Sequence, residues 1–453
     1  APTTIQGADN NGSGVAILLH LAEVFANENP LPYTLVFAFT DAEEYGMIGS
    51  RRYVETHPNL QQIIAGISLD NLGRTYYDGV KMELVGQYDG YGALWLALTA
   101  REAARAAGLW DVYLRSTFDQ VTDQAAPVSL MDQGPLVAAS IPAIGFAGHF
   151  PVSYADENYR LWHDPDDTLD YQSANVLGKS GLTAEALIRQ LLSMDKFPKA
   201  FSPYLYFDSS GQVLQGLPLW LIFCGFVIIF FLGSVLGGKT SIQEKLLGWR
   251  FALPHFLGLW MPLLASIILL YVFVWVGLMD RYHAYPATTK DPALLHPRWP
   301  AVILFLLGLG VFFYLGRRLV RGYVNSTKHA THIQIKSLSM FIIGLSGVYV
   351  LWLNPFALLF FVPLLFWLLI AGRRGVGKIL DLLLFLLGGL VVYALIYVFG
   401  FITLRYNLAF LWFMMNMFSI RMISFPTAAM ITAIFGAGLA LVINPAIDRG
   451  RSK

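Results

Sequence analysis

The stretch Thr-Asp-Ala-Glu-Glu-Tyr-Gly-Met-Ile-Gly-Ser, residues 40–50, follows directly on the apolar run Tyr-Thr-Leu-Val-Phe-Ala-Phe-Thr of residues 33–40. Such a run predicts a central strand of an α/β sheet that is covered on both faces. Glu43 and Glu44 then lie at the carboxyl end of the strand, where these sheets place their ligand crevices. Two adjacent glutamates can divide metal binding and proton transfer between them. A solvated helix start is the alternative that this stretch alone leaves open.

A second apolar run, residues 63–69, also ends in acid, because Asp70-Asn-Leu-Gly follows it. If the two predicted strands are parallel neighbours, their carboxyl ends meet at one edge of the sheet. We therefore expect Glu43, Glu44 and Asp70 to lie close together.

Two further stretches carry candidate ligands. Gly-Ala-Asp-Asn-Asn-Gly-Ser-Gly, residues 7–14, is a turn-rich loop that places Asp9 just before a predicted helix over residues 15–25. His163 lies in Trp-His-Asp-Pro-Asp-Asp-Thr, residues 162–168, which by itself favours a surface loop. In combination these groups favour a zinc site, because Asp, Glu and neutral His are the oxygen and nitrogen ligands of Zn²⁺.

The composition changes along the chain. Residues 1–200 alternate charged and apolar segments, whereas long apolar runs dominate from residue 217 and explain the 56% hydrophobic content. The sequence predicts an α/β domain over residues 1–200, a connector over 201–216 and a polytopic membrane domain over 217–445. The net charge of +1, with no concentrated basic stripe, argues against a nucleic-acid partner.

The membrane domain is expected to contain seven or eight spans, since about 20 apolar residues cross a bilayer. The predicted spans are residues 217–236, 256–278, 301–315, 338–353, 356–371, 379–402, 408–420 and 427–443. Loops after the first, third and fifth spans carry eleven Lys and Arg in all, against four after the second, fourth and sixth. This asymmetry predicts that the odd loops are cytoplasmic and that residues 1–200 are extracytoplasmic, either periplasmic or extracellular, or lumenal.

Five blocks together resemble one known family. They are the loop at residues 7–14, the Glu-Glu block at 39–50, Leu-Asp-Asn-Leu-Gly at 69–73, Ile-Pro-Ala-Ile at 141–144 and His-Asp-Pro-Asp-Asp-Thr at 163–168. In this order they resemble the co-catalytic zinc aminopeptidases of the MH clan, and they cover residues 1 to about 195. The resemblance implies an α/β zinc-exopeptidase domain with a mixed central sheet flanked by helices. The membrane half resembles the membrane-bound branch of the family.

The resemblance also implies roles for individual residues. Two zinc ions are expected, with Asp9 as the bridging carboxylate, Glu44, Asp70 and His163 as further ligands, and Glu43 as the general base that activates water. Peptides are the expected substrates. The family has a further ligand in a His-x-Asp element that would precede Ala1, so we expect the natural chain to continue upstream with that element.

Two other functions stay open. The domain could be a non-catalytic receptor or assembly module on the same scaffold, or a single-zinc glutaminyl cyclase. Retention of five ionisable groups at strand and loop ends argues against the module, because packing alone gives no reason to keep them.

Overall fold

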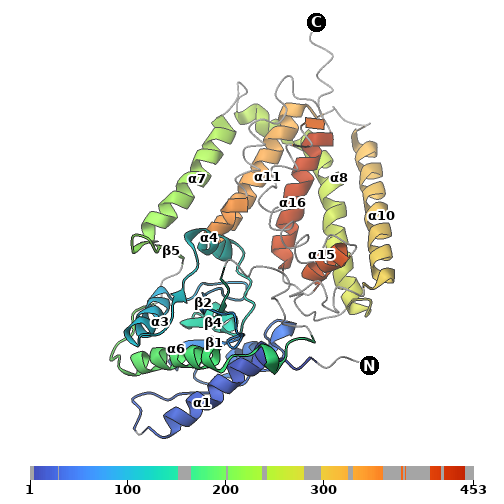
Figure 1. Cartoon of the computed structure of the whole chain (residues 1–453). Coiled ribbons are helices and arrows are strands. Elements are labelled where there is room, and N and C mark those ends of the chain that lie inside the picture. The colour runs from blue at the N-terminus through green and yellow to red at the C-terminus, as the bar shows by residue number, and fades with distance from the viewer. Residues whose placement is uncertain are drawn as a thin grey trace. The chain divides into compact units, whose positions relative to one another are not determined.

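The computed structural model describes residues 5–28, 30–151, 165–199, 203–236, 242–279, 297–324, 330–360, 379–380, 383, 409–419 and 423–443. The chain divides into two compact units, Ala1–Leu219 and Trp220–Lys453. Each unit is described by itself below (Figure 1).

The first unit is built on a mixed four-stranded sheet with the strand order β1-β4-β2-β3. β1 (Gly66–Leu69) runs parallel to β4 (Ala143–His149), β4 runs antiparallel to β2 (Gly79–Glu83), and β2 runs parallel to β3 (Val112–Tyr113). The expected α/β architecture with a mixed sheet is confirmed. Within the predicted run at residues 63–69, the strand β1 comprises only Gly66–Leu69, and Asp70 follows it directly.

Helices on both faces of the sheet build the core. Ile144 and Phe146 of β4 pack into one cluster with the apolar faces of α1 (Gly14–Ala26), α3 (Leu94–Ala106) and α6 (Ala174–Leu192). Gly145, between them, faces α5 (Gln133–Ala138) on the opposite side. This alternation is the period of two that a strand imposes on its side chains.

The predicted central strand at residues 33–40 is wrong. No described residue pairs with this segment, which runs extended into the turn η2 (Glu43–Tyr45). Leu35 and Phe37 pack against the core, while Val36 and Phe39 are 64% and 54% exposed. A strand requires a ladder partner, and β1, the next strand along the chain, pairs with β4 instead. Alternate side chains of this segment therefore pack against the core although the segment forms no strand, and its other face is exposed.

The segment expected as a connector contains a hairpin, β5 (Tyr204–Phe207) and β6 (Gln212–Gln215). Tyr204 and Tyr206 belong to the core of the first unit. Their strand is fixed to α4 (Thr117–Ala125), whose Gln120 and Gln124 side chains bond the backbone of both tyrosines.

The second unit is helical. It contains α7 (Leu217–Leu236, which begins at the unit boundary), α8 (Ile242–Trp275), α10 (Trp299–Val324), α11 (His332–Leu353), η7 (Pro355–Phe360), α15 (Ala409–Ser419) and α16 (Phe425–Ile443). Four stretches among the described residues are long and apolar enough to cross a membrane: Gly248–Trp275, Trp299–Gly322, Ile333–Leu353 and Phe425–Ile443.

These four stretches overlap the predicted spans at residues 256–278, 301–315, 338–353 and 427–443. The described part of the predicted span at 408–420 is α15, which has 11 residues. Most of the predicted spans at 356–371 and 379–402 lies outside the described residues.

Candidate metal centre

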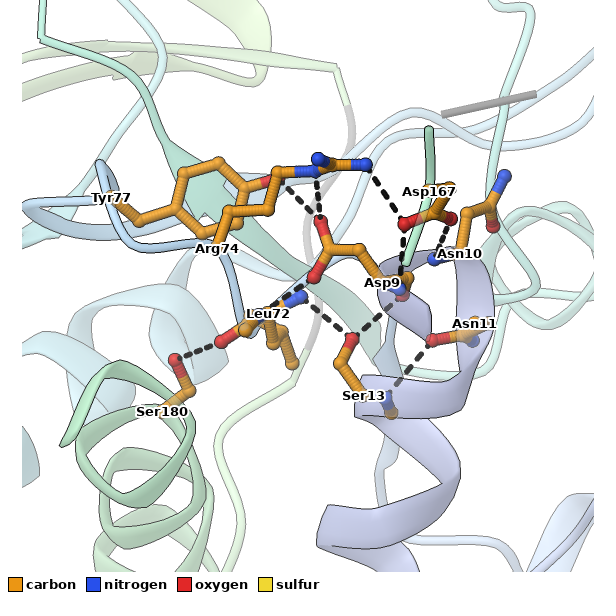
Figure 2. Close-up of polar contacts among 11 residues, drawn as sticks. Asp9, Asn10, Asn11, Ser13, Leu72, Arg74, Tyr77, Asp167 and Ser180 are labelled. Atoms are coloured by element: carbon orange, nitrogen blue, oxygen red, sulfur yellow. Dashed lines mark hydrogen bonds and ion pairs between the residues drawn. The ribbon is translucent and has the colours of Figure 1, made fainter. Parts of the chain in front are cut away.

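The loop that carries Asp9 lies against the carboxyl end of β1. Ser13 Oγ donates to the Asp9 carbonyl at 2.7 Å and accepts from the Leu72 amide at 2.9 Å, and Asn11 Nδ2 donates to the Leu69 carbonyl at 2.8 Å. Ser180 of α6 donates to the carbonyl of Leu72 from the other side. The bonds of Ser13, which Figure 2 shows, attach the loop to the chain that follows β1, and the Asn11 bond attaches it to the last residue of that strand.

The Asp9 side chain is fully buried and bonded to protein groups through both oxygens. Oδ1 accepts the Gly73 amide at 2.8 Å, and Oδ2 accepts the Tyr77 hydroxyl at 2.8 Å and lies 3.3 Å from Arg74 Nε. Burial raises the pKa of Asp9 above its ordinary value, against the opposing effects of Gly73, Tyr77 and Arg74. Asp9 is thus held inside the domain by two hydrogen-bond donors, the Gly73 amide and the Tyr77 hydroxyl, and by the ion pair with Arg74.

Arg74 joins this carboxylate to a second one. Its Nη2 lies 2.8 Å from Asp167 Oδ1, and all three side chains, of Arg74, Asp9 and Asp167, are 0% exposed. Asp167 also accepts the backbone amides of Asp9 and Asn10, each at 3.0 Å. Arg74 and Asp167 therefore fix the backbone of the loop as well as the Asp9 side chain.

The Asn10 side chain points toward Glu44 and not into the buried cluster around Asp9. Its Nδ2 donates to Glu44 Oε1 at 3.0 Å, so the loop meets the Glu-Glu block through this side chain. In Figure 2 the Asn10 amide points away from the Asp9 carboxylate. Sequence reasoning missed Asn10, because it singled out the charged residue of the loop.

The Glu-Glu block forms the tight turn η2, flanked by residues in the left-handed region. Ala42, Gly46 and Met47 have φ of 57°, 87° and 56°, and the Glu43 carbonyl accepts the amides of Gly46 and Met47. A left-handed conformation is strained for alanine and methionine, and such strain persists only where the surroundings hold it. Met47, 1% exposed, supplies a buried anchor for this turn.

Three other carboxylates surround Glu43. Desolvation by burial, followed by the charges of Glu44, Asp70 and Asp132, raises the pKa of Glu43 to about 9. Asp132 precedes α5, and its Oδ2 accepts the Thr40 hydroxyl at 2.6 Å. The structure thus brings together the predicted residues Glu43, Glu44 and Asp70, and adds Asp132. Like charges in one half-buried cluster favour a cation among them.

The donor set fits a zinc ion in part. Oxygen ligands from Glu44 and Asp70 are of the type that Zn²⁺ accepts, whereas the Asp9 oxygens are already bonded to Gly73, Tyr77 and Arg74. Over the described residues, no group of three His, Cys, Asp or Glu is arranged to hold a metal. His163 lies outside the described residues.

His149 of the first unit also has a defined partner. His149, at the end of β4, has its Nδ1 2.7 Å from Asp78 Oδ1, and its ring stacks on Tyr113 at a centroid distance of 3.6 Å. It is held by this pair and this stacking contact.

A mixed sheet with a carboxylate cluster beyond the end of one strand defines the first unit as an α/β domain with a candidate metallohydrolase site. Residues 1–188 match the model of peptidase family M28, so this part of the chain is similar to that family. The chain is 30% identical over 190 residues to the probable lipoprotein aminopeptidase LpqL of Mycobacterium tuberculosis, covering 39% of this chain and 37% of the relative.

It is also 26% identical over 195 residues to aminopeptidase YwaD of Bacillus subtilis, covering 43% of this chain and 39% of the relative. The chain therefore spans about two fifths of the length of these two curated relatives. Among solved structures, the zinc aminopeptidase BSAP of Bacillus subtilis matches 45% of this chain and 47% of its own, with 22% identity and a TM-score of 0.36.

Proposed function

We propose that the protein is a membrane-anchored zinc exopeptidase that removes N-terminal residues from peptides. The observation that carries the proposal is the convergence of Glu43, Glu44 and Asp70, which come from two separate segments within a domain similar to peptidase family M28. Two relatives of this domain are named as aminopeptidases, which favours that class of exopeptidase.

Glu44, Asp70 and His163 are the residues that would hold zinc. When bound, zinc polarises the scissile carbonyl and lowers the pKa of a water molecule. Glu43 is then the general base: its carboxylate accepts the proton of the attacking water and passes it to the leaving amine. Burial, followed by the neighbouring carboxylates, raises the pKa of Glu43 to about 9 in the metal-free protein, and a bound cation would lower it, so its activity as a base depends on an occupied centre.

The membrane helices supply the anchor. Four of them have the length and composition of spans, and the distribution of Lys and Arg supports an extracytoplasmic peptidase domain. A non-catalytic module and a glutaminyl cyclase are the competing functions, and product analysis separates them: free amino acid, no product, or a cyclised N-terminus.

Replacing Glu43 tests the mechanism. The variant Glu43→Gln keeps the shape of the side chain but loses the proton acceptor, so the turnover of aminoacyl substrates should fall about 10²- to 10⁴-fold while zinc stays bound. Thr56→Ala, at an exposed hydroxyl of α2 (Ile48–Thr56), is the control and should leave turnover unchanged. Wild-type turnover in Glu43→Gln would show that Glu43 is not the base.

A further inference from the structure

Asp9 and Asn10 are neighbours in the chain, yet their side chains contact different parts of the domain. Asp9 points into the buried cluster with Arg74 and Tyr77, and Asn10 points to Glu44. Figure 2 shows the two side chains leaving the loop in different directions. Only one residue of this pair can face the Glu-Glu block while the backbone stays in this conformation.

The backbone of the loop is strongly constrained. Asp167 accepts both the Asp9 and the Asn10 amide, and Ser13 bonds the Asp9 carbonyl. For Asp9 to reach a metal beside Glu44, its carboxylate would have to leave the Gly73 amide, the Tyr77 hydroxyl and Arg74. That movement would deprive a fully buried guanidinium of one of its two carboxylate partners.

From this geometry we infer that Asn10, and not Asp9, is the residue that the loop presents to the metal centre, and that the centre holds one zinc ion per chain. The inference rests on the proposed function and refines it. A ligand that bridges two cations must supply negative charge to both, as a carboxylate does with its two oxygens. An amide supplies one neutral oxygen, and its nitrogen is a hydrogen-bond donor only.

Asp9 then has a different task. Together with Arg74 and Asp167 it is a positioning residue, which holds the loop so that Asn10 adjoins Glu44. The observed bond is consistent with this division, because Asn10 donates its N–H to the Glu44 carboxylate. A donor in this position neutralises part of the charge of the cluster, where a second carboxylate would add to it.

Zinc stoichiometry decides between the two assignments. The full natural protein, purified in detergent, is equilibrated by dialysis against a buffer of fixed free zinc, and zinc per chain is measured by mass spectrometry. We expect one zinc in the wild type and two in Asn10→Asp, in which the amide becomes a carboxylate of the same shape. Asn27→Asp adds the same charge at an exposed site beyond α1 and should still bind one. Asp9→Asn should also bind one zinc, with a lower unfolding temperature.

Two zinc ions in the wild type, or no gain in Asn10→Asp, would overturn the inference. Loss of zinc from an Asp9→Asn variant that retains its unfolding temperature would do the same, because it would identify Asp9 as a ligand. If Asp9→Asn does not fold, the comparison of the wild type with Asn10→Asp still decides. The absence of zinc from both of these proteins would overturn the proposed function together with the inference, whereas a wild type with two ions leaves the proposed function standing.

Discussion

Replacing Arg74 by methionine should strongly destabilise the first unit. Arg74 pairs with Asp9 at 3.3 Å and Asp167 at 2.8 Å, and all three side chains are 0% exposed. Arg74→Met keeps much of the side-chain length but leaves two buried carboxylates without their cation. Breaking a buried pair from one side typically costs about 3–5 kcal/mol, because the remaining charge is uncompensated.

This cost converts into a measurable shift. Unit 1 comprises Ala1–Leu219, and for a domain of that size 1 kcal/mol corresponds to roughly 2–4 °C. We therefore expect Arg74→Met to lower the unfolding temperature of this unit by about 6–20 °C at neutral pH. Differential scanning fluorimetry of the full chain, with parallel proteolysis to follow unit 1, measures the shift.

Arg52→Met is the matched control. Arg52 lies 3.8 Å from Glu55 in α2, and the two side chains are 73% and 58% exposed, so this surface pair contributes little. Its loss should lower the unfolding temperature by no more than about 4 °C, on the surface-pair scale of about 0–1 kcal/mol. If Arg74→Met changed the unfolding temperature no more than Arg52→Met does, the buried cluster would not be holding the loop.

Two further predictions concern charge. In metal-free protein Glu43 is neutral in both states below pH 4.5; above that value the unfolded chain loses the proton first, so stability should fall as the pH rises toward about 9. Unfolding temperatures at pH 5 and pH 8.5 should show this fall, and Glu43→Gln should reduce it; an equal slope in both proteins would contradict the assigned pKa. For topology, protease sites inserted after Lys245 or within residues 317–336 should be cut from the cytoplasmic side of oriented vesicles, and a site at Gly181 from the opposite side. Cleavage at all three from one side would refute the predicted orientation.

The sequence predicted the elements whose own pattern carries enough information. Residues 63–69 read as a buried strand because the apolar run ends in turn residues, and they correspond to β1. The run at residues 33–40 has the same character, but pairing is a property of two segments and not of one. No local signal showed that β1 would pair with β4 alone among the described residues.

The site shows the same limit at a finer scale. Clustering of Glu43, Glu44 and Asp70 followed from the positions of acids after apolar runs. The same reasoning could not predict which of Asp9 and Asn10 faces the Glu-Glu block, because adjacent loop residues can point either way. That choice depends on Arg74 and Asp167, which lie 65 and 158 residues after Asp9 in the chain. The His-Asp-Pro-Asp-Asp-Thr block was singled out for His163, yet its described contribution is Asp167.

Metal removal tests the central claim most directly. The full-length protein should hydrolyse aminoacyl substrates, lose that activity when zinc is removed by a chelator, and regain it when zinc is returned, since burial and the carboxylates around Glu43 raise its pKa and a bound cation would lower it. Turnover is measured before chelation, after chelation and after zinc addition, with Glu43→Gln as the inactive reference. Release of N-terminal residues at an undiminished rate from zinc-free protein, or no release in any of the three conditions, would contradict the account.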